Sequence, residues 1–202
     1  MDPLAAAAAA AREEDGSLVP LELSHAGCRE LDLTELEFRE SVFTSCTFSQ
    51  CDFSHAALYG CVFRRCRFDR CRFAAGYWKD VLLEDCRADG ADLRRCRLKS
   101  CVLRDCRLPY ANLTEIVLDR TVLQNCCLRE TALSSAKLSR TSFQKVDLSG
   151  AELFRTILSG LDLSSCTLDG ISLSQSCAEL RGARINASQA AVVARILGIE
   201  VV

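Results

Sequence analysis

The sequence predicts an all-β solenoid whose chain coils around one narrow core, and two observations predict it. The first is a large apolar residue at every fifth position. From residue 33 to residue 173 there are 29 consecutive positions of this kind without an insertion, and 27 of them hold Leu or Phe. The second is a small or apolar residue two places before each of these. A period of five fits neither a helix nor a single strand, and a fixed-period repeat determines the fold before local propensity does.

Each unit of five residues is predicted to be a short extended segment followed by a tight turn. Four units make a square coil of about 20 residues, and successive coils stack at the strand spacing of about 4.8 Å. The large residue fills the axis, and each coil forms backbone hydrogen bonds with the next. We call the large residues the centre column. Representative members are Phe48, Phe63, Phe68, Phe73, Leu93, Leu113, Leu133 and Leu153.

The repeat resembles the pentapeptide-repeat family, whose motif is A(D/N)LXX. The nearest matches are Ala91-Asp92-Leu93, Ala111-Asn112-Leu113 and Ala151-Glu152-Leu153. The resemblance implies that residues 21–180 form a right-handed quadrilateral β-helix. It covers about three quarters of the chain and is more specific for fold than for function.

Residues 1–20 precede the repeat, and their alanine run has a high helix propensity. Two interpretations stay open for them: a mobile tail, or a helix that covers the open end of the rod. A solenoid needs such a cover because its last coil exposes strand edges and core. We expect the chain to enter the first, irregular coil at Val19.

Residues 181–202 are predicted to form a C-terminal cap with a short helix. Asn186 or Ser188 can cap its N-terminus, Gly198 can end it, and Ile199 to Val202 can form a short strand. The helix carries apolar residues at helical spacing. We expect this helix to cover the last coil and also to form a homodimer. The expected dimerisation residues are Ala190, Val193, Ile196, Leu197 and Ile199.

Fourteen cysteines are the most unusual feature of the composition. Eleven of them occupy the position two places before a centre, so their spacing is the repeat itself. Buried free cysteine resembles a small hydrophobic residue, and this interpretation is preferred over a metal or redox site. Cys28, Cys127 and Cys177 lie outside this position and are expected to be the exposed thiols. A stacked ladder of thiols is predicted along one wall: Cys46, Cys66, Cys86, Cys106, Cys126 and Cys166.

Charge is distributed unevenly along the chain. Residues 1–63 carry a net charge of −8, residues 64–107 of +6, and residues 108–202 of zero. Arg67, Arg87 and Arg107 are expected to stack in one outward column. This column is interpreted as a salt-bridged face or, alternatively, as a contact strip for an anionic partner.

Several classes of protein are disfavoured. No apolar run approaches the length of a membrane span, and the alanine-rich start lacks the basic region and cleavage site of a signal peptide, so a cytoplasmic protein is expected. The formal net charge of −2 does not predict direct nucleic-acid binding. There is no phosphate loop, metal cluster or catalytic constellation, so neither an enzyme nor a cofactor is expected.

The uninterrupted register and residues 179–202 resemble the Qnr- and MfpA-type branch of the pentapeptide-repeat family. This resemblance implies a rod that dimerises through its C-terminal helix, binds DNA gyrase or topoisomerase IV as a DNA mimic, and protects the enzyme from quinolones or toxins. The acidic residues nearest the expected dimer centre are Asp147, Glu152, Asp162 and Asp169. The basic middle of the chain departs from a continuous acidic face. The alternative is a general protein-interaction scaffold with an unknown partner.

Overall fold

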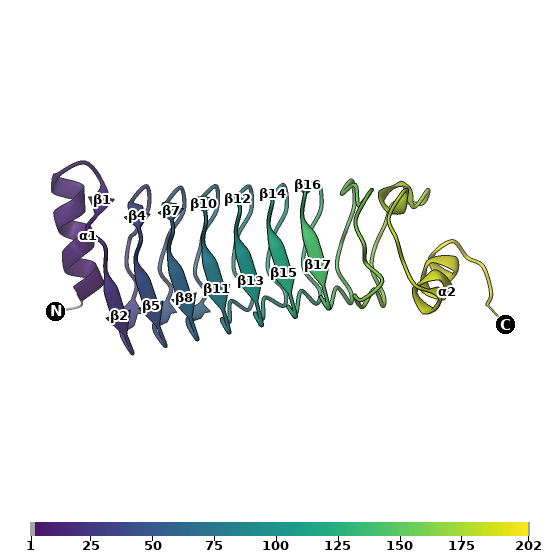
Figure 1. The fold of residues 1–202 in the computed structure, drawn as a ribbon, viewed down its shortest axis with the longest axis horizontal. Coiled ribbons are helices and arrows are strands. Elements are labelled where there is room, and N and C mark those ends of the chain that lie inside the picture. Colours follow the sequence, from purple (N-terminus) through teal and green to yellow (C-terminus); the bar gives the residue numbers. More distant parts are fainter. Residues whose placement is uncertain (1–2, 202) are drawn as a thin grey trace.

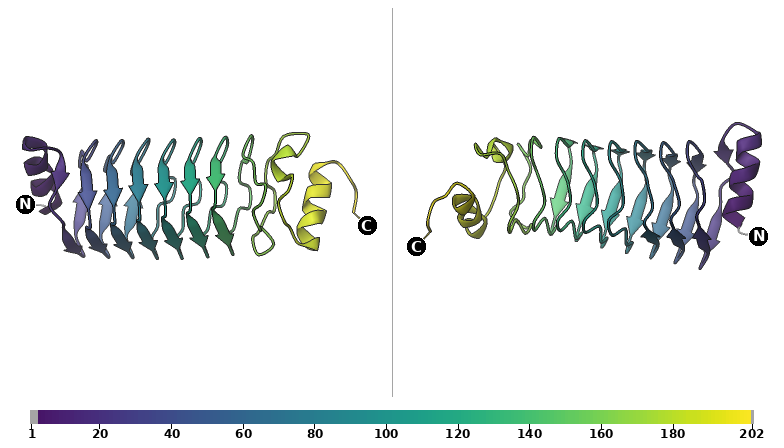
Figure 2. Two further views of the ribbon diagram at one scale, coloured as in Figure 1. Left: turned by 45° about the horizontal axis from the view of Figure 1, so that its top comes forward. Right: turned by 180° about the vertical axis from the view of Figure 1, so that it is seen from behind.

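The chain forms a straight rod with a helix at each end. The computed structural model describes residues 3–201, and Figure 1 shows its coils stacked between α1 (Pro3–Glu13) and α2 (Ala187–Ile196). The other two views show the same single stack of coils (Figure 2). The predicted fold class, a quadrilateral β-helix with a short C-terminal helix, is confirmed.

The coils have four faces, and the strand pairs in them are parallel and join residues 20 apart, except for the last bridge, Asp162–Arg184. The first face is a seven-stranded sheet: β1 (Ser17–Leu18), β4 (Glu37–Arg39), β7 (Ala57–Tyr59), β10 (Tyr77–Lys79), β12 (Arg97–Lys99), β14 (Val117–Asp119) and β16 (Lys137–Ser139). The second face is also seven-stranded: β2 (Glu22–Ser24), β5 (Val42–Thr44), β8 (Val62–Arg64), β11 (Leu82–Glu84), β13 (Val102–Arg104), β15 (Val122–Gln124) and β17 (Ser142–Gln144).

The third and fourth faces have less regular pairing. The third face begins with β3 (Gly27–Arg29), β6 (Thr47–Ser49) and β9 (Arg67–Asp69) and continues as single-residue bridges from Arg67 to Thr167. The fourth face consists of such bridges from Asp32 to Ser172. Backbone hydrogen bonds nevertheless connect the coils on all four sides, for example from Val62 to Ser41 and from Phe73 to Asp92.

The corners explain the period of five. Every fifth residue from His25 to Gly160 has a positive φ, which turns the chain between two faces. Most of these positions hold residues other than glycine, although this conformation is unfavourable for side chains with a Cβ. The corner N–H groups form hydrogen bonds with the next coil, as from Ser45 to Arg64 at 2.8 Å. Each of these units of five therefore contains a three-residue segment, one left-handed corner and the small inward residue.

The centre column fills the axis and changes character along the rod. In the N-terminal half the centres are mostly Phe, and rings 20 residues apart are stacked, as in Phe48–Phe68 with 5.1 Å between centroids. In the C-terminal half the centres are mostly Leu, which fill the axis less completely. A small apolar void of about 20 Å³ lies there among residues that include Leu103, Leu118 and Phe143.

Helix α1 covers the N-terminal end of the rod. Leu4, Ala8 and Ala11 are buried against the first coil, and the Arg12 guanidinium forms an ion pair with Asp32 at 3.0 Å. Of the two interpretations left open for this segment, the structure shows the helix. The first coil begins at Ser17, which pairs with Glu37, slightly before the expected entry at Val19.

The C-terminal end is closed by the short 3-10 helix η1 (Ala178–Leu180) and by α2. Asn186 is the N-cap of α2 and forms a capping box with Gln189. Gln189 is buried, and its amide donates hydrogen bonds to the carbonyls of Leu163 and Cys166 at 2.7 and 2.6 Å. The strand expected after Gly198 does not form over residues 199–201, and Val202 lies outside the described residues.

Candidate interaction surfaces

The centre column points into the rod and is buried except at Leu138, which is partly exposed. All eight residues singled out from the sequence, from Phe48 to Leu153, are buried. Their role in the structure is to fill the axis of the rod. Any binding function must therefore use side chains that point outward from the four faces, the corners or the two ends.

The inward cysteines are also buried, and their thiols are hydrogen-bonded. Cys46, Cys66, Cys86, Cys106 and Cys126 are stacked, and each donates a hydrogen bond to the carbonyl 23 residues earlier, as in Cys66 to Phe43 at 3.3 Å. Val146 fills the next position, and Cys166 donates to Phe143 at 3.7 Å.

Threonine makes the same bond elsewhere, as in Thr121 to Leu98 at 3.2 Å. The inward position therefore accepts a small side chain that can also donate to a carbonyl, a preference that the interpretation of cysteine as a small hydrophobic residue missed. Burial raises the pKa of the Cys101 thiol to about 11, so this thiol is a poor nucleophile.

Two of the three cysteines expected to be exposed are not. Cys28 is a centre residue of the first coil and is 1% exposed, and Cys177 is 8% exposed at the C-terminal cap. Only Cys127 is partly exposed. The expectation was wrong for Cys28 because the irregular first coil already follows the repeat register, and for Cys177 because the cap covers it.

Arg67, Arg87 and Arg107 form one column on the third face, where successive residues are bridge partners. Arg67 has an ion pair with Asp69 at 3.5 Å. Among the described residues Arg87 and Arg107 form no ion pair. The sequence nevertheless places Asp85, Asp89 and Asp105 in the neighbouring outward columns, so this face is mixed in charge.

The four acidic residues near the C-terminal end do not form one surface. Asp147 and Asp169 belong to the third face, Glu152 to the fourth and Asp162 to the second. Asp147 pairs with Arg129 at 3.2 Å, and Asp162 pairs with Arg184 at 2.7 Å.

Both of these Asp side chains also accept a hydrogen bond from the backbone N–H two residues later. Hydrogen bonds from Ser164 lower the pKa of Asp162. Much of this acidic set therefore stabilises turns.

The C-terminal cap leaves an apolar surface exposed. Ile196 packs partly against the core, and Val193 is partly buried, whereas Ala190 is exposed. Leu197, Ile199 and Val201 are 49%, 55% and 48% exposed. The side chains expected to mediate dimerisation are thus divided between covering the last coil and facing outward.

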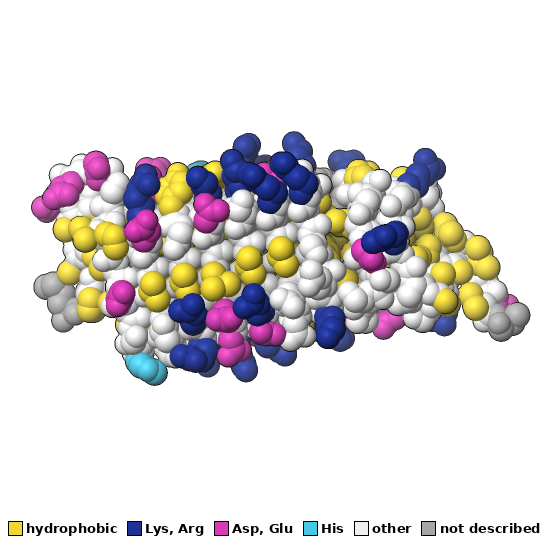
Figure 3. All heavy atoms as spheres, viewed as in Figure 1, with side chains coloured by type: hydrophobic (Ala, Val, Ile, Leu, Met, Phe, Trp, Pro, Cys, Tyr) yellow, Lys and Arg dark blue, Asp and Glu magenta, His cyan; other side chains and the backbone are white. Residues whose placement is uncertain are grey.

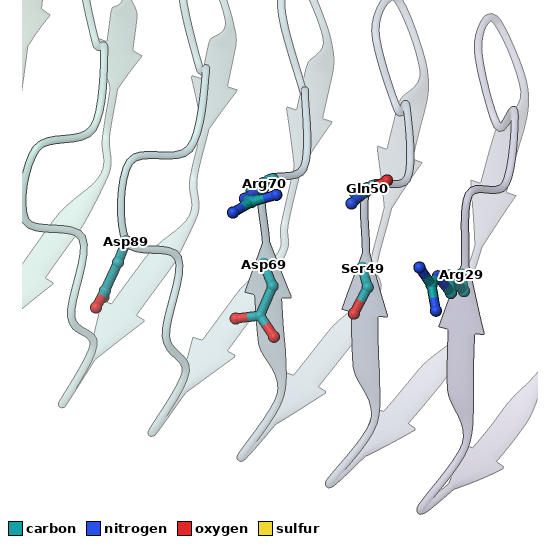
Figure 4. Close-up of a pocket in the computed structure, with 6 residues that line it drawn as sticks. All are labelled: Arg29, Ser49, Gln50, Asp69, Arg70 and Asp89. Atoms are coloured by element: carbon teal, nitrogen blue, oxygen red, sulfur yellow. The ribbon is translucent and has the colours of Figure 1, made fainter.

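A shallow groove of about 490 Å³ crosses the N-terminal coils at the third face (Figure 4). It lies over Ser49, whose short side chain leaves space between Arg29 and Asp69, and Gln50, Arg70 and Asp89 complete its lining. Two arginines and two aspartates line it, so it has no net charge and selects no obvious ligand.

Two surface features of the first and second faces were missed in the sequence. We call Val42, Val62, Leu82, Val102 and Val122 the apolar stripe; they are direct ladder partners on the second face. Lysines and arginines gather on the first face and at its corner with the second; this basic cluster comprises Lys79, Arg97, Lys99, Arg120, Lys137 and Arg140. Both appear in Figure 3, the stripe along the middle of the rod and the cluster above it. Taking every twentieth residue would have found the stripe, and comparing adjacent outward columns would have found the cluster.

Within residues 3–201, no group of three or more His, Cys, Asp or Glu side chains is arranged to hold a metal ion. None of the helices in this part of the chain has the length and hydrophobicity needed to cross a membrane.

Comparison with known proteins identifies the repeat. A family profile described as "Pentapeptide repeat region" matches residues 58–133, and one described as "Pentapeptide repeats (8 copies)" matches residues 22–58 and 131–170. No curated protein matches the sequence.

Among solved structures, the chain is similar to a trypsin-treated variant of QnrB1, described as a plasmid-mediated fluoroquinolone resistance protein. The identity is 23%, the TM-score is 0.54, and the match covers 92% of this chain and 98% of that one. A further match is HetL, a pentapeptide repeat protein involved in heterocyst differentiation regulation in the cyanobacterium Nostoc sp. strain PCC 7120. It has 22% identity and a TM-score of 0.26, and the match covers 82% of this chain and 89% of that one.

Proposed function

Because the chain belongs to the pentapeptide-repeat family, whose profiles together match residues 22–170, we propose that it is a non-enzymatic, rod-shaped protein of the Qnr kind. In this proposal it acts in the cytoplasm, binds a type II DNA topoisomerase, either gyrase or topoisomerase IV, as a DNA mimic, and protects the enzyme from quinolones or toxins.

The observation that carries this proposal is the uninterrupted rod. Its axis is filled by the centre column, and its coils continue from Ser17 to Leu173 without a loop insertion. A filled rod offers only its outer faces and its ends for contact. A protein that occupies the duplex-DNA site of an enzyme would bind through the same kind of surface. The fold that the chain shares with QnrB1 agrees with this role, and the role itself is inferred.

The position of the negative charge indicates which part of the rod would act as the DNA mimic. The acids near the C-terminal end are scattered over three faces, whereas residues 1–63 carry a net charge of −8. The N-terminal coils are therefore the better DNA-like surface of this chain. Glu35 and Glu40 lie there at corners of the coil, where their side chains are exposed.

The test is supercoiling by purified gyrase and decatenation by topoisomerase IV, each with and without ciprofloxacin. We expect the protein to inhibit the reaction, or to restore it in the presence of the drug, at low micromolar concentration. The double variant Glu35→Lys/Glu40→Lys should weaken this effect by about tenfold, because it reverses charge on the proposed surface. The matched control, Glu152→Lys/Asp169→Lys, reverses two exposed charges near the other end and should change it little.

A general interaction scaffold remains the second candidate, and the basic middle of the rod favours it. No effect of the folded wild-type protein on either topoisomerase would reject the topoisomerase proposal. An effect that both double variants retain would reject the assignment to the N-terminal coils.

A further inference from the structure

The apolar stripe faces outward from five strands of the second face, each of which is paired on both sides. Its five side chains belong to β5, β8, β11, β13 and β15, and all five are partly exposed. The columns that flank them on the same face are polar: Arg64, Glu84 and Arg104 are joined by ion pairs of 3.2 and 3.0 Å. The stripe is thus a narrow apolar line bordered on one side by a row of ion-paired side chains.

The other border of the stripe is strongly basic. The basic cluster has six cations against two acids, Asp80 and Asp119, which gives a net charge of +4. Arg120 and Arg140 share Asp119 at 3.4 and 2.7 Å. Within the described part of the chain Lys79, Arg97, Lys99 and Lys137 form no ion pair. Within residues 3–201, four cations of the cluster therefore have no ion-paired partner.

From this juxtaposition we propose that the first and second faces together dock an amphipathic α-helix of a partner protein, with its apolar side on the stripe and an acidic flank on the basic cluster. The five strands that carry the stripe are each paired with a neighbouring strand on both sides, so a partner strand cannot pair with them. A helix matches the stripe because its pitch of 5.4 Å is close to the coil spacing of about 4.8 Å.

The length of the stripe limits the length of the partner helix that can contact it. The stripe spans four coil steps, or roughly 19 Å at the strand spacing, which corresponds to about 13 residues of helix. Apolar side chains at i, i+4, i+7 and i+11 would face the stripe. This surface lies on the middle coils, and the proposal does not depend on topoisomerase binding.

Fluorescence polarisation with a designed peptide tests the proposal on the full chain. The labelled probe has about 14 residues, leucines at those four positions and glutamates along one flank. We expect a micromolar Kd. Two comparison peptides, one with shuffled leucines and one with lysine in place of glutamate, should bind at least about tenfold more weakly.

Matched variants separate the two halves of the surface. Val62→Thr/Val102→Thr removes apolar contact but keeps β-branched residues in the ladder, and Arg97→Glu reverses an unpaired exposed charge. Each should weaken binding of the acidic peptide by about five- to tenfold. Val19→Thr at the N-terminal end and Arg87→Glu on the third face are the controls and should leave Kd unchanged.

Three results would overturn the proposal. The first is equal binding of all three peptides, and the second is no difference between the surface variants and the controls. In the third, the designed peptide does not bind, whereas a single-stranded oligonucleotide of about 15 nucleotides does, and Arg97→Glu weakens the binding of the oligonucleotide. That pattern would assign the basic cluster to nucleic acid.

Discussion

At the scale of single residues, the size of an inward residue is adapted to the size of the centre residue two places later. Trp78 is the bulkiest centre, and Gly76 precedes it by two places. A Cβ at Gly76 would lie 3.0 Å from the Phe73 carbonyl oxygen, 3.2 Å from that of Ala56 and 3.4 Å from the Trp78 indole nitrogen. Its φ is not in the left-handed region, so glycine is required here by space and not by backbone conformation.

Gly76→Ala is therefore expected to destabilise the rod by about 1–3 kcal/mol, the usual cost of overpacking a core. Urea unfolding measures this cost. The control is Gly27→Ala, because a Cβ at Gly27 meets no atom within 4 Å. If both substitutions change the unfolding midpoint equally, the explanation by close contact is wrong.

The Asp or Asn of the motif has its own local function. Asp92 accepts a hydrogen bond from the backbone N–H of Arg94 at 3.1 Å, and Asn112 makes the same contact with Thr114 at 3.1 Å. This bond holds the turn. The Arg94 guanidinium also donates to Asp92 at 2.8 and 2.6 Å. Hydrogen bonding from Arg94 lowers the pKa of Asp92.

Asp92→Asn should keep the turn and lose the ion pair, at a cost of about 0.5 kcal/mol at pH 7. Asp92→Ala should lose both, at about 1–2 kcal/mol. The folded pKa lies below the unfolded value of about 3.9, so the charge stabilises the fold above that value, and its contribution is lost as pH falls through the folded pKa. Unfolding at pH 7 and pH 3 checks this: the difference in unfolding free energy between the wild type and Asp92→Asn should be smaller at pH 3 than at pH 7. A difference that does not shrink on acidification would contradict the role of the charge.

At the scale of elements, the repeat could be predicted in detail because one register governs every coil. The centre column and the four faces follow directly from counting by five and by twenty. The ends were less predictable, since α1 and α2 are outside the repeat and their state depends on what they cover. The burial of Leu4 and Gln189 comes from contacts with the first and last coils, which no local propensity shows.

The candidate surfaces, like the fold, could be predicted only in part from the repeat. Arg67, Arg87 and Arg107 stack as counting predicts, but whether a column is a charged surface depends on its neighbours. Asp69 neutralises one of these arginines, whereas the first face gathers cations from three separate columns. Such gatherings cross the period of twenty, so they become visible only when adjacent columns are compared side by side.

At the scale of the whole molecule, the distribution of charge depends on how two rods would meet. If the C-terminal caps pair, the basic middles flank a nearly neutral centre, and the two segments of net charge −8 lie at the far ends. The DNA-like surface would then be duplicated at both tips of a long rod and would not form one central saddle. Dimerisation through the cap is therefore the assumption to test.

Exposed side chains of the cap give a direct test. Leu197 and Ile199 are about half exposed, and an aspartate at either position would have to be desolvated in an apolar interface. We expect light scattering coupled to gel filtration to give twice the 22.2 kDa of one chain for the wild type and a single chain for Ile199→Asp. Val19→Asp is the control, because Val19 is 77% exposed at the opposite end and should leave the dimer intact. A monomeric wild type would reject dimerisation through the cap. A dimer that Ile199→Asp preserves and Val19→Asp breaks would move the interface to the N-terminal end and place the acidic ends together at the centre of the assembly.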